Sequence, residues 1–314
     1  MKQSGQKGAA GRMIAALVIA AGRTGRKMGF APQKKVGTIS AIERAVTVLQ
    51  RADISHICVV CADNQTEKLV ARRNVVFLRS SSGAQMFDCI KQGLGYLRDQ
   101  CDAALIVPVD LALCSVQTVR ALAAARGSVC VPAYQGRNGH PILLRGDCFD
   151  TLCAYTGPGG LGGAIYHAGL DRTVVPVDDA GILEDVQRTP EARRLPGTQE
   201  LQKLYLEVEI TLCKEQPFFG PQTLQLLRLT QETGSLLAAC RRVGVSYSKG
   251  RGMIAAAEAQ LGGALLARQQ GGASGGSSVV TARGAQLMQR YRAYCDAVQA
   301  SARDLFGIYF PEET

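Results

Sequence analysis

Residues 17–32 read LVIAAGRTGRKMGFAP, and this stretch decides the fold class of the first half of the chain. It begins as a short apolar run typical of a buried parallel strand, then breaks at Gly22 into a loop holding Arg23, Arg26 and Lys27. Glycines let backbone N–H groups approach an anion and the cations neutralise it, so the pattern favours phosphate binding. An ordinary strand-to-helix turn is the alternative, because the spacing matches neither GxGxxG nor GxxxxGK[ST].

The chain alternates strand-like and helix-like segments from residue 17 to about residue 179. Apolar runs occupy residues 17–20, 57–61, 75–78, 104–107, 129–132 and 173–177. Stretches with helical periodicity occupy residues 39–52, 65–72, 85–98 and 116–125. This alternation predicts a doubly wound α/β domain of the Rossmann type, with a mostly parallel sheet and ligands at the carboxyl ends of the strands.

The composition indicates a two-domain protein that works in a reducing compartment. The chain has 314 residues, a net charge of +10 and eleven cysteines, many of them inside apolar runs. Such cysteines fit buried free thiols better than a disulfide framework, and the positive charge favours polyanionic partners. No apolar run reaches the roughly 20 residues that a membrane span needs, so we expect a cytoplasmic protein without a membrane contact.

Four regions are expected along the chain. Residues 1–12 form a disordered leader, residues 13–187 form the α/β domain, residues 188–204 form a linker, and residues 205–314 form a second domain. The linker is rich in proline and charge and lacks apolar periodicity.

Asp110 follows the fourth apolar run, LIVPVD. A strand that ends in an aspartate delivers a carboxylate to the carboxyl edge of a parallel sheet, where it can hold Mg²⁺ against a triphosphate. The alternative is that Asp110 caps the helix that starts near Ser115.

The segment Ala20-Ala21-Gly22 with its basic, glycine-rich loop resembles the signature of nucleotidyltransferases that transfer a nucleotide from an NTP to molybdopterin. The resemblance implies a nucleotidyltransferase-like fold, with CTP or GTP as the donor and Mg²⁺ as the cofactor. The residues that it assigns to the nucleotide are Ala21, Gly22, Arg23, Gly25, Arg26, Lys27 and, at a helix start, Gln85. Arg26 is expected on the triphosphate as a catalytic residue. Ala31 stands where the family has a phosphate-binding lysine.

Three further segments extend this resemblance. Asp110 matches the family's metal-binding aspartate in a D-x-P motif, with Ala112 at the proline position, and Asp185 matches an acidic segment that supplies a second metal ligand. Gly139 and His140 belong to a GHP motif on the acceptor side, for which a structural histidine is the alternative. Gly159 and Gly160 lie in a flexible glycine-rich loop, 157–163, expected either near the acceptor pocket or as a surface connection.

The second domain has the pattern of a winged helix-turn-helix. Helices are predicted at 222–232, 236–243 and 247–261, preceded by a short strand at 207–213. Two strand candidates, 265–268 and 279–281, flank the Gly/Ser segment 269–278, which reads either as a wing or as a linker. Residues 218–292 carry nine basic and two acidic residues, and this net charge of +7 is either a solvated face or a DNA-binding footprint.

This domain resembles the DNA-binding domain of the molybdate-responsive regulators, through Gly220-Pro221, ETGS at 232–235, SYSKG at 246–250 and QQGGASGGSSVVTARG at 269–284. The resemblance implies a homodimer on double-stranded DNA with a C-terminal dimerisation helix. The residues that it assigns to DNA are Ser246, Tyr247, Ser248, Lys249, Arg251 and Arg268.

Together the two resemblances predict a bifunctional protein that joins a nucleotidyltransferase of molybdenum cofactor biosynthesis to a transcription-regulator module. The first alternative is a regulator whose transferase-like domain only senses nucleotide or cofactor, which Ala31 and Ala112 favour. The second alternative is nucleotidyl transfer to another phosphorylated acceptor, such as a sugar.

Overall fold

The chain forms two compact units in the computed structural model, which describes residues 13–23, 32–71, 73–81, 83–111, 113–186, 199–269 and 277–311. The first unit comprises Met1–Thr66 and Leu78–Glu200, and the second comprises Glu67–Phe77 and Leu201–Thr314. No helix in the described ranges combines the length and the apolar character that a membrane span requires.

The first unit is built on an eight-stranded sheet with the order β10-β7-β9-β6-β1-β4-β5, and β8 pairs with β7 beside this path. Its strands are β1 (Ile14–Ala20), β4 (His56–Cys61), β5 (Val76–Arg79), β6 (Ala103–Pro108), β7 (Val129–Tyr134), β8 (Arg137–Asn138), β9 (Ile142–Arg145) and β10 (Arg172–Pro176). β1 runs parallel to β4 and β6, and β10 runs parallel to β7. The prediction of an α/β fold with a mostly parallel sheet is therefore confirmed.

β9 is antiparallel to both of its neighbours, β6 and β7. The sequence analysis predicted neither this strand nor its direction, because a four-residue apolar run beside a turn is too short to show a strand period. A small hairpin, β2 (Lys35–Val36) and β3 (Ile39–Ser40), lies between β1 and the first helix.

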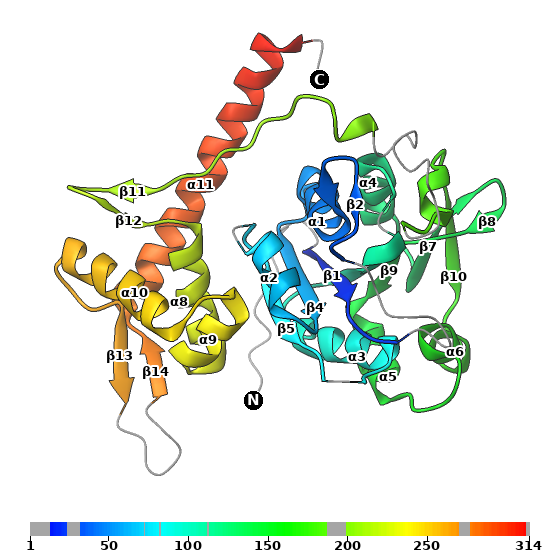
Figure 1. Cartoon of the computed structure of the whole chain (residues 1–314), viewed down its shortest axis with the longest axis horizontal. Helices are drawn as coiled ribbons and strands as arrows, with labels where there is room; N and C mark the ends of the chain where they lie inside the picture. The colour runs from blue at the N-terminus through cyan, green and yellow to red at the C-terminus, as the bar shows by residue number, and fades with distance from the viewer. Residues whose placement is uncertain are drawn as a thin grey trace, which may run out of the picture. The chain divides into compact units, whose positions relative to one another are not determined.

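Helices cover both faces of the sheet. They are α1 (Ala41–Arg51), α2 (Asn64–Val70), α3 (Met86–Leu97), α4 (Val116–Ala124), α5 (Phe149–Ala154) and α6 (Gly160–His167), with 3₁₀ turns η1 (Val109–Leu111), η2 (Gly146–Cys148) and η3 (Ala180–Leu183). α1 packs with α4 on one face, whereas α3 packs with α5 and α6 on the other (Figure 1). Between these layers β1 is buried from Ala15 to Ala20, as expected for a central strand.

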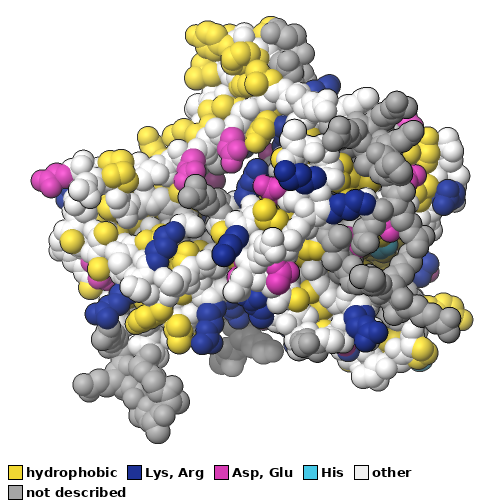
Figure 2. All heavy atoms as spheres, viewed as in Figure 1, with side chains coloured by type: hydrophobic (Ala, Val, Ile, Leu, Met, Phe, Trp, Pro, Cys, Tyr) yellow, Lys and Arg dark blue, Asp and Glu magenta, His cyan; other side chains and the backbone are white. Residues whose placement is uncertain are grey.

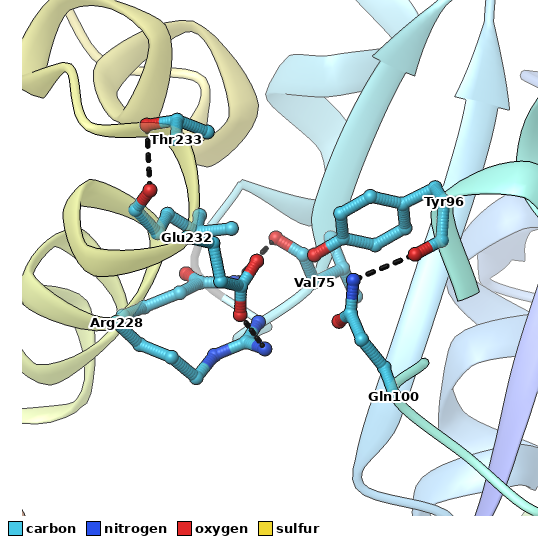
Figure 3. Close-up of polar contacts among 8 residues, drawn as sticks. Val75, Tyr96, Gln100, Arg228, Glu232 and Thr233 are labelled. Carbon is cyan, nitrogen blue, oxygen red and sulfur yellow. Dashed lines mark hydrogen bonds and ion pairs between the residues drawn. The ribbon is translucent and has the colours of Figure 1, made fainter. Parts of the chain in front are cut away.

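Local hydrogen bonds mark the start of one helix and the end of another. Ser40 and Glu43 form a capping box at α1, in which Glu43 N donates to Ser40 Oγ at 3.4 Å and Ser40 N donates to Glu43 Oε2 at 2.8 Å. At the other end of a helix, Gln100 Nε2 donates to the carbonyl of Tyr96 at 2.7 Å after α3 (Figure 3). The helices α1 to α4 lie within a few residues of the ranges that the sequence predicts.

The glycine-rich segment 157–163 is not a continuous flexible loop, so this expectation was wrong. α6 begins at Gly160, because Ala164 and Ile165 are buried in the core and their packing outweighs the low helix propensity of glycine. Gly163 must be glycine, since a Cβ there would lie 2.1 Å from the carbonyl oxygen of Pro158.

The described residues of the second unit include four main helices and two short antiparallel ribbons. They are α8 (Pro221–Thr233), α9 (Leu236–Val243), α10 (Tyr247–Leu261) and α11 (Ala282–Tyr309), with β11 (Leu212–Cys213) paired to β12 (Pro217–Phe219) and β13 (Leu266–Gln269) paired to β14 (Ser277–Val280). α9 and α10 have the bounds that the sequence predicts. The strand expected at 207–213 is much shorter, since only Leu212–Cys213 pair.

A compact apolar core and a surface ion pair stabilise the second unit. Phe219 packs edge-on against Tyr291 with ring centroids 5.0 Å apart, and Tyr291 Oη donates to the carbonyl of Ile210 at 2.6 Å. Along α8, Arg228 Nη1 lies 2.8 Å from Glu232 Oε1, one helical turn away (Figure 3). α11 therefore joins this core through its first half, where Met288 and Tyr291 are buried.

Candidate functional site

The chain leaves β1 through Ala21, Gly22 and Arg23, which are bound to the start of α3. Arg23 N donates to the carbonyl of Ala84 at 3.0 Å, and Met86 N donates to the carbonyl of Arg23 at 3.1 Å. Gly22 has φ of 102°, and a Cβ there would lie 2.8 Å from Met86 Cα, so only glycine fits. The predicted residues Gly25, Arg26 and Lys27 lie outside the described residues, as does Ala31.

A pocket of about 550 Å³ opens beside this contact. Its lining includes Arg23 and Gln85 together with Gly159 and Gly160, so residues expected at the nucleotide meet residues expected at the acceptor. Gln85 is the N-cap residue of α3, and its backbone N donates to Asp88 Oδ2 at 3.1 Å. The structure therefore brings two predicted subsites into one pocket.

Side chains that the sequence analysis missed form the wall of this pocket. Phe87 and Tyr155 meet edge to face with centroids 6.2 Å apart, and Tyr155 Oη donates to the carbonyl of Pro158 at 2.8 Å. Lys91 Nζ lies 5.2 Å from the Phe87 ring centroid and 3.4 Å from Asp88 Oδ1. Only the position of Phe87 and Lys91 one turn apart, just after a helix start, hinted at this wall.

Asp110 lies in η1 directly after β6, at the edge of the sheet where β1 also ends. Ile19 and Pro108 are partners in neighbouring parallel strands, so the residues that follow them emerge side by side. The N-cap of α4 is Ser115, whose Oγ accepts from Thr118 N at 3.1 Å, and the alternative that Asp110 caps this helix is therefore wrong.

Asp185 is next to Asp110, although 75 positions separate them in the sequence. Val186 N donates to the carbonyl of Asp110 at 2.7 Å, which places the backbone of Asp185 beside η1. Both aspartates are half-buried. Mg²⁺ in nucleotide sites takes one or two carboxylates completed by phosphate oxygens, and both side chains have this ligand chemistry. Among the described residues no cluster of three or more His, Cys, Asp or Glu side chains could hold a metal by itself.

Gly139 and His140 are held against η3. His140 N donates to the carbonyl of Ile182 at 3.0 Å, and a Cβ on Gly139 would lie 2.3 Å from that same oxygen. The peptide bond between His140 and Pro141 is cis. His140 Nδ1 is buried and has no hydrogen-bond partner among the described residues, and burial lowers the pKa of His140 to about 4. The imidazole is therefore neutral at pH 7, and it keeps a free hydrogen-bonding position.

Asp179 is a further residue that the sequence analysis missed. It is only 2% exposed, and its carboxylate binds the start of α4 and the start of η3. Its partners on α4, Ser115 and Thr118, lie more than 60 positions away in the sequence, and the single local signal was an aspartate two residues before Gly181.

The second unit presents the predicted DNA-binding residues on the first turns of α10. Ser246 is the N-cap, and its Oγ accepts from Lys249 N at 3.2 Å. Ser246, Tyr247, Ser248, Lys249 and Arg251 are all exposed. Arg268 lies in β13, where it pairs with Ser278, and the Gly/Ser segment 270–276 lies outside the described residues.

Comparison with known proteins finds a family for most of the first unit. A family model described as "MobA-like NTP transferase domain" matches residues 16–173. No curated protein matches the chain.

Three of the solved structures that the chain resembles illustrate the match. A nucleotidyl transferase from Methanothermobacter thermautotroptrophicus (Mth528) is 22% identical, with 53% of this chain and 88% of that chain covered and a TM-score of 0.46. Rv0371C from Mycobacterium tuberculosis H37Rv, in complex with manganese, is 17% identical, with 59% and 97% covered and a TM-score of 0.44. The bifunctional IspDF from Campylobacter jejuni is 13% identical, with 58% and 55% covered and a TM-score of 0.48.

Proposed function

The chain belongs to the MobA-like NTP transferase domain family, and from this premise we propose that its first unit transfers a nucleotide from CTP or GTP to molybdopterin, releasing pyrophosphate. The observation that carries the proposal is the hydrogen bond from Val186 N to the carbonyl of Asp110, 2.7 Å long. It brings Asp110 and Asp185 together at the edge of the sheet where the loop after β1 begins.

Each group of residues has a separate task in this reaction. The backbone at Ala21 and Gly22 takes the nucleoside with Arg23 and Gln85, and the cations Arg26 and Lys27 balance the triphosphate charge. Asp110 and Asp185 would hold Mg²⁺, which supplies charge neutralisation at the phosphates when it is bound. Gly159 and Gly160 leave room for the acceptor.

The bond change is an in-line displacement at the α-phosphorus of the NTP. A terminal phosphate oxygen of the acceptor forms the new P–O bond while the bond to pyrophosphate breaks, and the leaving group departs with the electron pair. The attacking oxygen is already anionic, so no general base is needed, and the protein contributes positioning and electrostatics.

His140 takes part as a neutral group on the acceptor side. Because burial lowers its pKa to about 4, it does not pair with a phosphate as a cation at neutral pH.

We further propose that residues 205–314 form a winged helix-turn-helix module that binds double-stranded DNA, joined to a transferase domain of residues 13–187 by the linker 188–204. The exposed first turns of α10 with Lys249 and Arg251 support this proposal, as do the β13–β14 ribbon behind α10 and the net charge of +7 over residues 218–292. A helix of this kind reads bases in the major groove while cations on the ribbon, such as Arg268, contact phosphates.

A homodimer through α11 completes the proposal. Leu305, Ile308 and Tyr309 are each more than half exposed, and Figure 2 shows hydrophobic side chains gathered over the end of this helix. All eleven cysteines are free thiols, which supports a role in the reducing cytoplasm.

Pyrophosphate release by the full chain tests the enzymatic proposal. The reaction contains Mg²⁺, molybdopterin and CTP, GTP or ATP in turn, and we expect turnover with one nucleotide. Nucleotide binding without turnover would favour the alternative, a regulator that senses nucleotide or cofactor. Turnover only with a phosphorylated sugar would move the acceptor to another class. If the chain neither bound a nucleotide nor turned one over, that result would contradict the proposal.

A further inference from the structure

Residues 179–186 form a segment that contacts three other parts of the first unit. Asp179 binds the start of α4, Ile182 binds the GHP segment, and Val186 binds Asp110. We propose that Asp179 is a positioning residue that fixes this segment and thereby holds Asp185 beside Asp110. This inference rests on the proposed function, because it gives the aspartate pair its metal-binding role.

The carboxylate of Asp179 accepts three hydrogen bonds from two directions. Its Oδ2 accepts from Ser115 N at 2.7 Å and from Thr118 Oγ1 at 2.6 Å, both at the first turn of α4. Its Oδ1 accepts from Gly181 N at 2.9 Å and so starts η3. One buried side chain thus joins the helix after Asp110 to the segment that leads to Asp185.

The rest of the segment follows the same path along the chain that carries Asp110. A Cβ on Gly181 would lie 2.1 Å from the carbonyl oxygen of Leu113, so these two backbones are in close contact. From there the contacts run in order, with Asp179 at Ser115, Gly181 at Leu113 and Val186 at Asp110. Displacement of the Asp179 end therefore shifts the Asp185 end against η1.

A buried cation adds a second reason for a carboxylate at this position. Arg44 of α1 is 1% exposed, and its Nη2 donates to the carbonyl of Leu113 at 3.4 Å. Burial lowers the pKa of Arg44, while attraction to Cys114, Asp179 and Glu200 opposes that shift. Because a buried cation needs compensating charge, the carboxylates of Asp179 and Glu200 both favour the buried Arg44, and Asp179 also accepts all three hydrogen bonds.

Asparagine at this position would keep the shape but change both properties. Its amide presents one acceptor and one donor group, so at least one of the three N–H or O–H donors would face an N–H. The negative charge near Arg44 would also be lost. Asp179 does not line the pocket beside Gln85, so its effect on the reaction passes through the aspartates that it positions.

The test compares Asp179→Asn with Asp178→Asn in the full chain. Asp178 is the neighbouring carboxylate and is exposed, so it is the matched control. Affinity for Mn²⁺ in the presence of CTP or GTP is measured by electron paramagnetic resonance, and amide exchange of residues 180–186 is followed by mass spectrometry. Asp179→Asn is expected to weaken Mn²⁺ binding about 10-fold or more, the cost typical of losing an outer partner of a metal ligand, and to speed exchange at 180–186. Asp178→Asn is expected to match wild type in both measurements.

A second variant keeps the test decisive if Asp179→Asn does not fold. Thr118→Val removes one of the three donors at nearly constant volume, and the same two changes are expected with a smaller size, about 3-fold in affinity. Raised Mn²⁺ should restore the transfer rate of either variant, because the ligands themselves remain, but it should not restore Asp110→Asn.

The outcomes separate this inference from the proposed function. If Asp110→Asn loses Mn²⁺ binding while Asp179→Asn binds as wild type and residues 180–186 exchange at the wild-type rate, the positioning role of Asp179 is wrong. If the wild type itself binds no Mn²⁺ with either nucleotide, the proposed function fails. The exchange of 180–186 still decides the structural step in that case, since unchanged exchange in Asp179→Asn overturns it.

Discussion

The two units build their candidate sites in opposite ways. In the first unit the site joins segments that are distant in sequence, since Arg23 binds the start of α3 and Asp110 binds Val186. In the second unit the exposed face of α10 depends on caps made within a few residues, such as Ser246 with Lys249. A site assembled across a sheet therefore depends on the whole fold, whereas a site on a capped helix depends mainly on that helix and its core contacts.

Two helices with the same Gly-x-Gly spacing allow this contrast to be measured. α3 carries Gly93 and Gly95, and α10 carries Gly250 and Gly252. In each pair the first glycine meets a neighbouring element and the second faces open space. Replacement by alanine should therefore lower the stability at the first glycine of each pair and raise it at the second.

Gly93→Ala should have the largest effect on stability. A Cβ at Gly93 would lie 2.2 Å from Leu17 Cδ1, and Leu17 is fully buried in β1. Overpacking of this kind costs about 1–3 kcal/mol, and we expect the upper end because all the terminal atoms of Leu17 are in the way. Urea unfolding of the full chain, followed by amide hydrogen exchange in β1 peptides, measures this loss of stability.

Gly95→Ala is the control for that variant. With nothing within 4 Å of the new Cβ, it should stabilise α3 by up to about 1 kcal/mol. Equal effects from the two variants would mean that the packing of α3 on β1 does not limit the first unit.

The DNA-binding face tests the claim that α10 acts through its own exposed residues. Lys249→Ala combined with Arg251→Ala should weaken binding to duplex DNA about 10-fold or more near 0.1 M salt, and should lower the salt slope by about 2 because each phosphate contact contributes about 0.9. Fluorescence anisotropy over a salt series measures both quantities. Arg120→Ala, an exposed cation on α4 of the first unit, is the control. An unchanged affinity and slope would show that α10 is not the recognition helix.

Gly250→Ala should cost less than Gly93→Ala, about 1–2 kcal/mol. The new Cβ would lie 2.3 Å from Cys240 Sγ, a single terminal atom of α9 that can move aside. Gly252→Ala, in open space, should stabilise α10 by about 0.5–1 kcal/mol, and thermal unfolding of the second unit compares the two. If Gly252→Ala stabilises the protein but weakens DNA binding, Gly252 serves close approach to DNA.

The smallest expected effect near neutral pH is a pH dependence that comes from His140. Its pKa is about 4 in the folded chain and about 6.5 when unfolded, so the unfolded state binds more protons between these values. Stability should therefore fall as the pH drops from 6.5 toward 4, by about 1.4 kcal/mol at pH 5.5, and the loss from this group levels off below pH 4. His140→Asn should flatten the profile between pH 7 and pH 5.5, whereas His167→Asn, on the exposed surface of α6, should leave it unchanged. A profile unaffected by His140→Asn would contradict the burial of this ring.

The reach of sequence reasoning follows the same division between local and distant contacts. α10 runs from residue 247 to residue 261 as the sequence predicts, and in the structure Ser246 caps its start and Gly262 ends it in a left-handed conformation with φ of 68°. The parallel strands were found from their apolar runs, and Asp110 from its position after one of them.

The features that were missed depend on contacts that no local pattern encodes. Asp179 gains its role only because Ser115 and Thr118 lie against it, and β9 gains its direction from β6 and β7. Gly160 starts a helix because Ala164 and Ile165 are buried, a tertiary effect that overrides glycine's low propensity. The meeting of Gln85 with Gly160 in one pocket is likewise a product of the fold.

The most direct test of the central claim is transfer of the nucleotide itself. Single-turnover transfer of label from α-³²P CTP or GTP to molybdopterin is compared for wild type, Asp110→Asn and Asp150→Asn, the last being an exposed carboxylate on α5. We predict that Asp110→Asn loses about 10²–10³-fold in rate, as expected when one preorganised electrostatic partner of the transition state is removed, while Asp150→Asn matches wild type. Transfer by Asp110→Asn at the wild-type rate would contradict the assignment of the site.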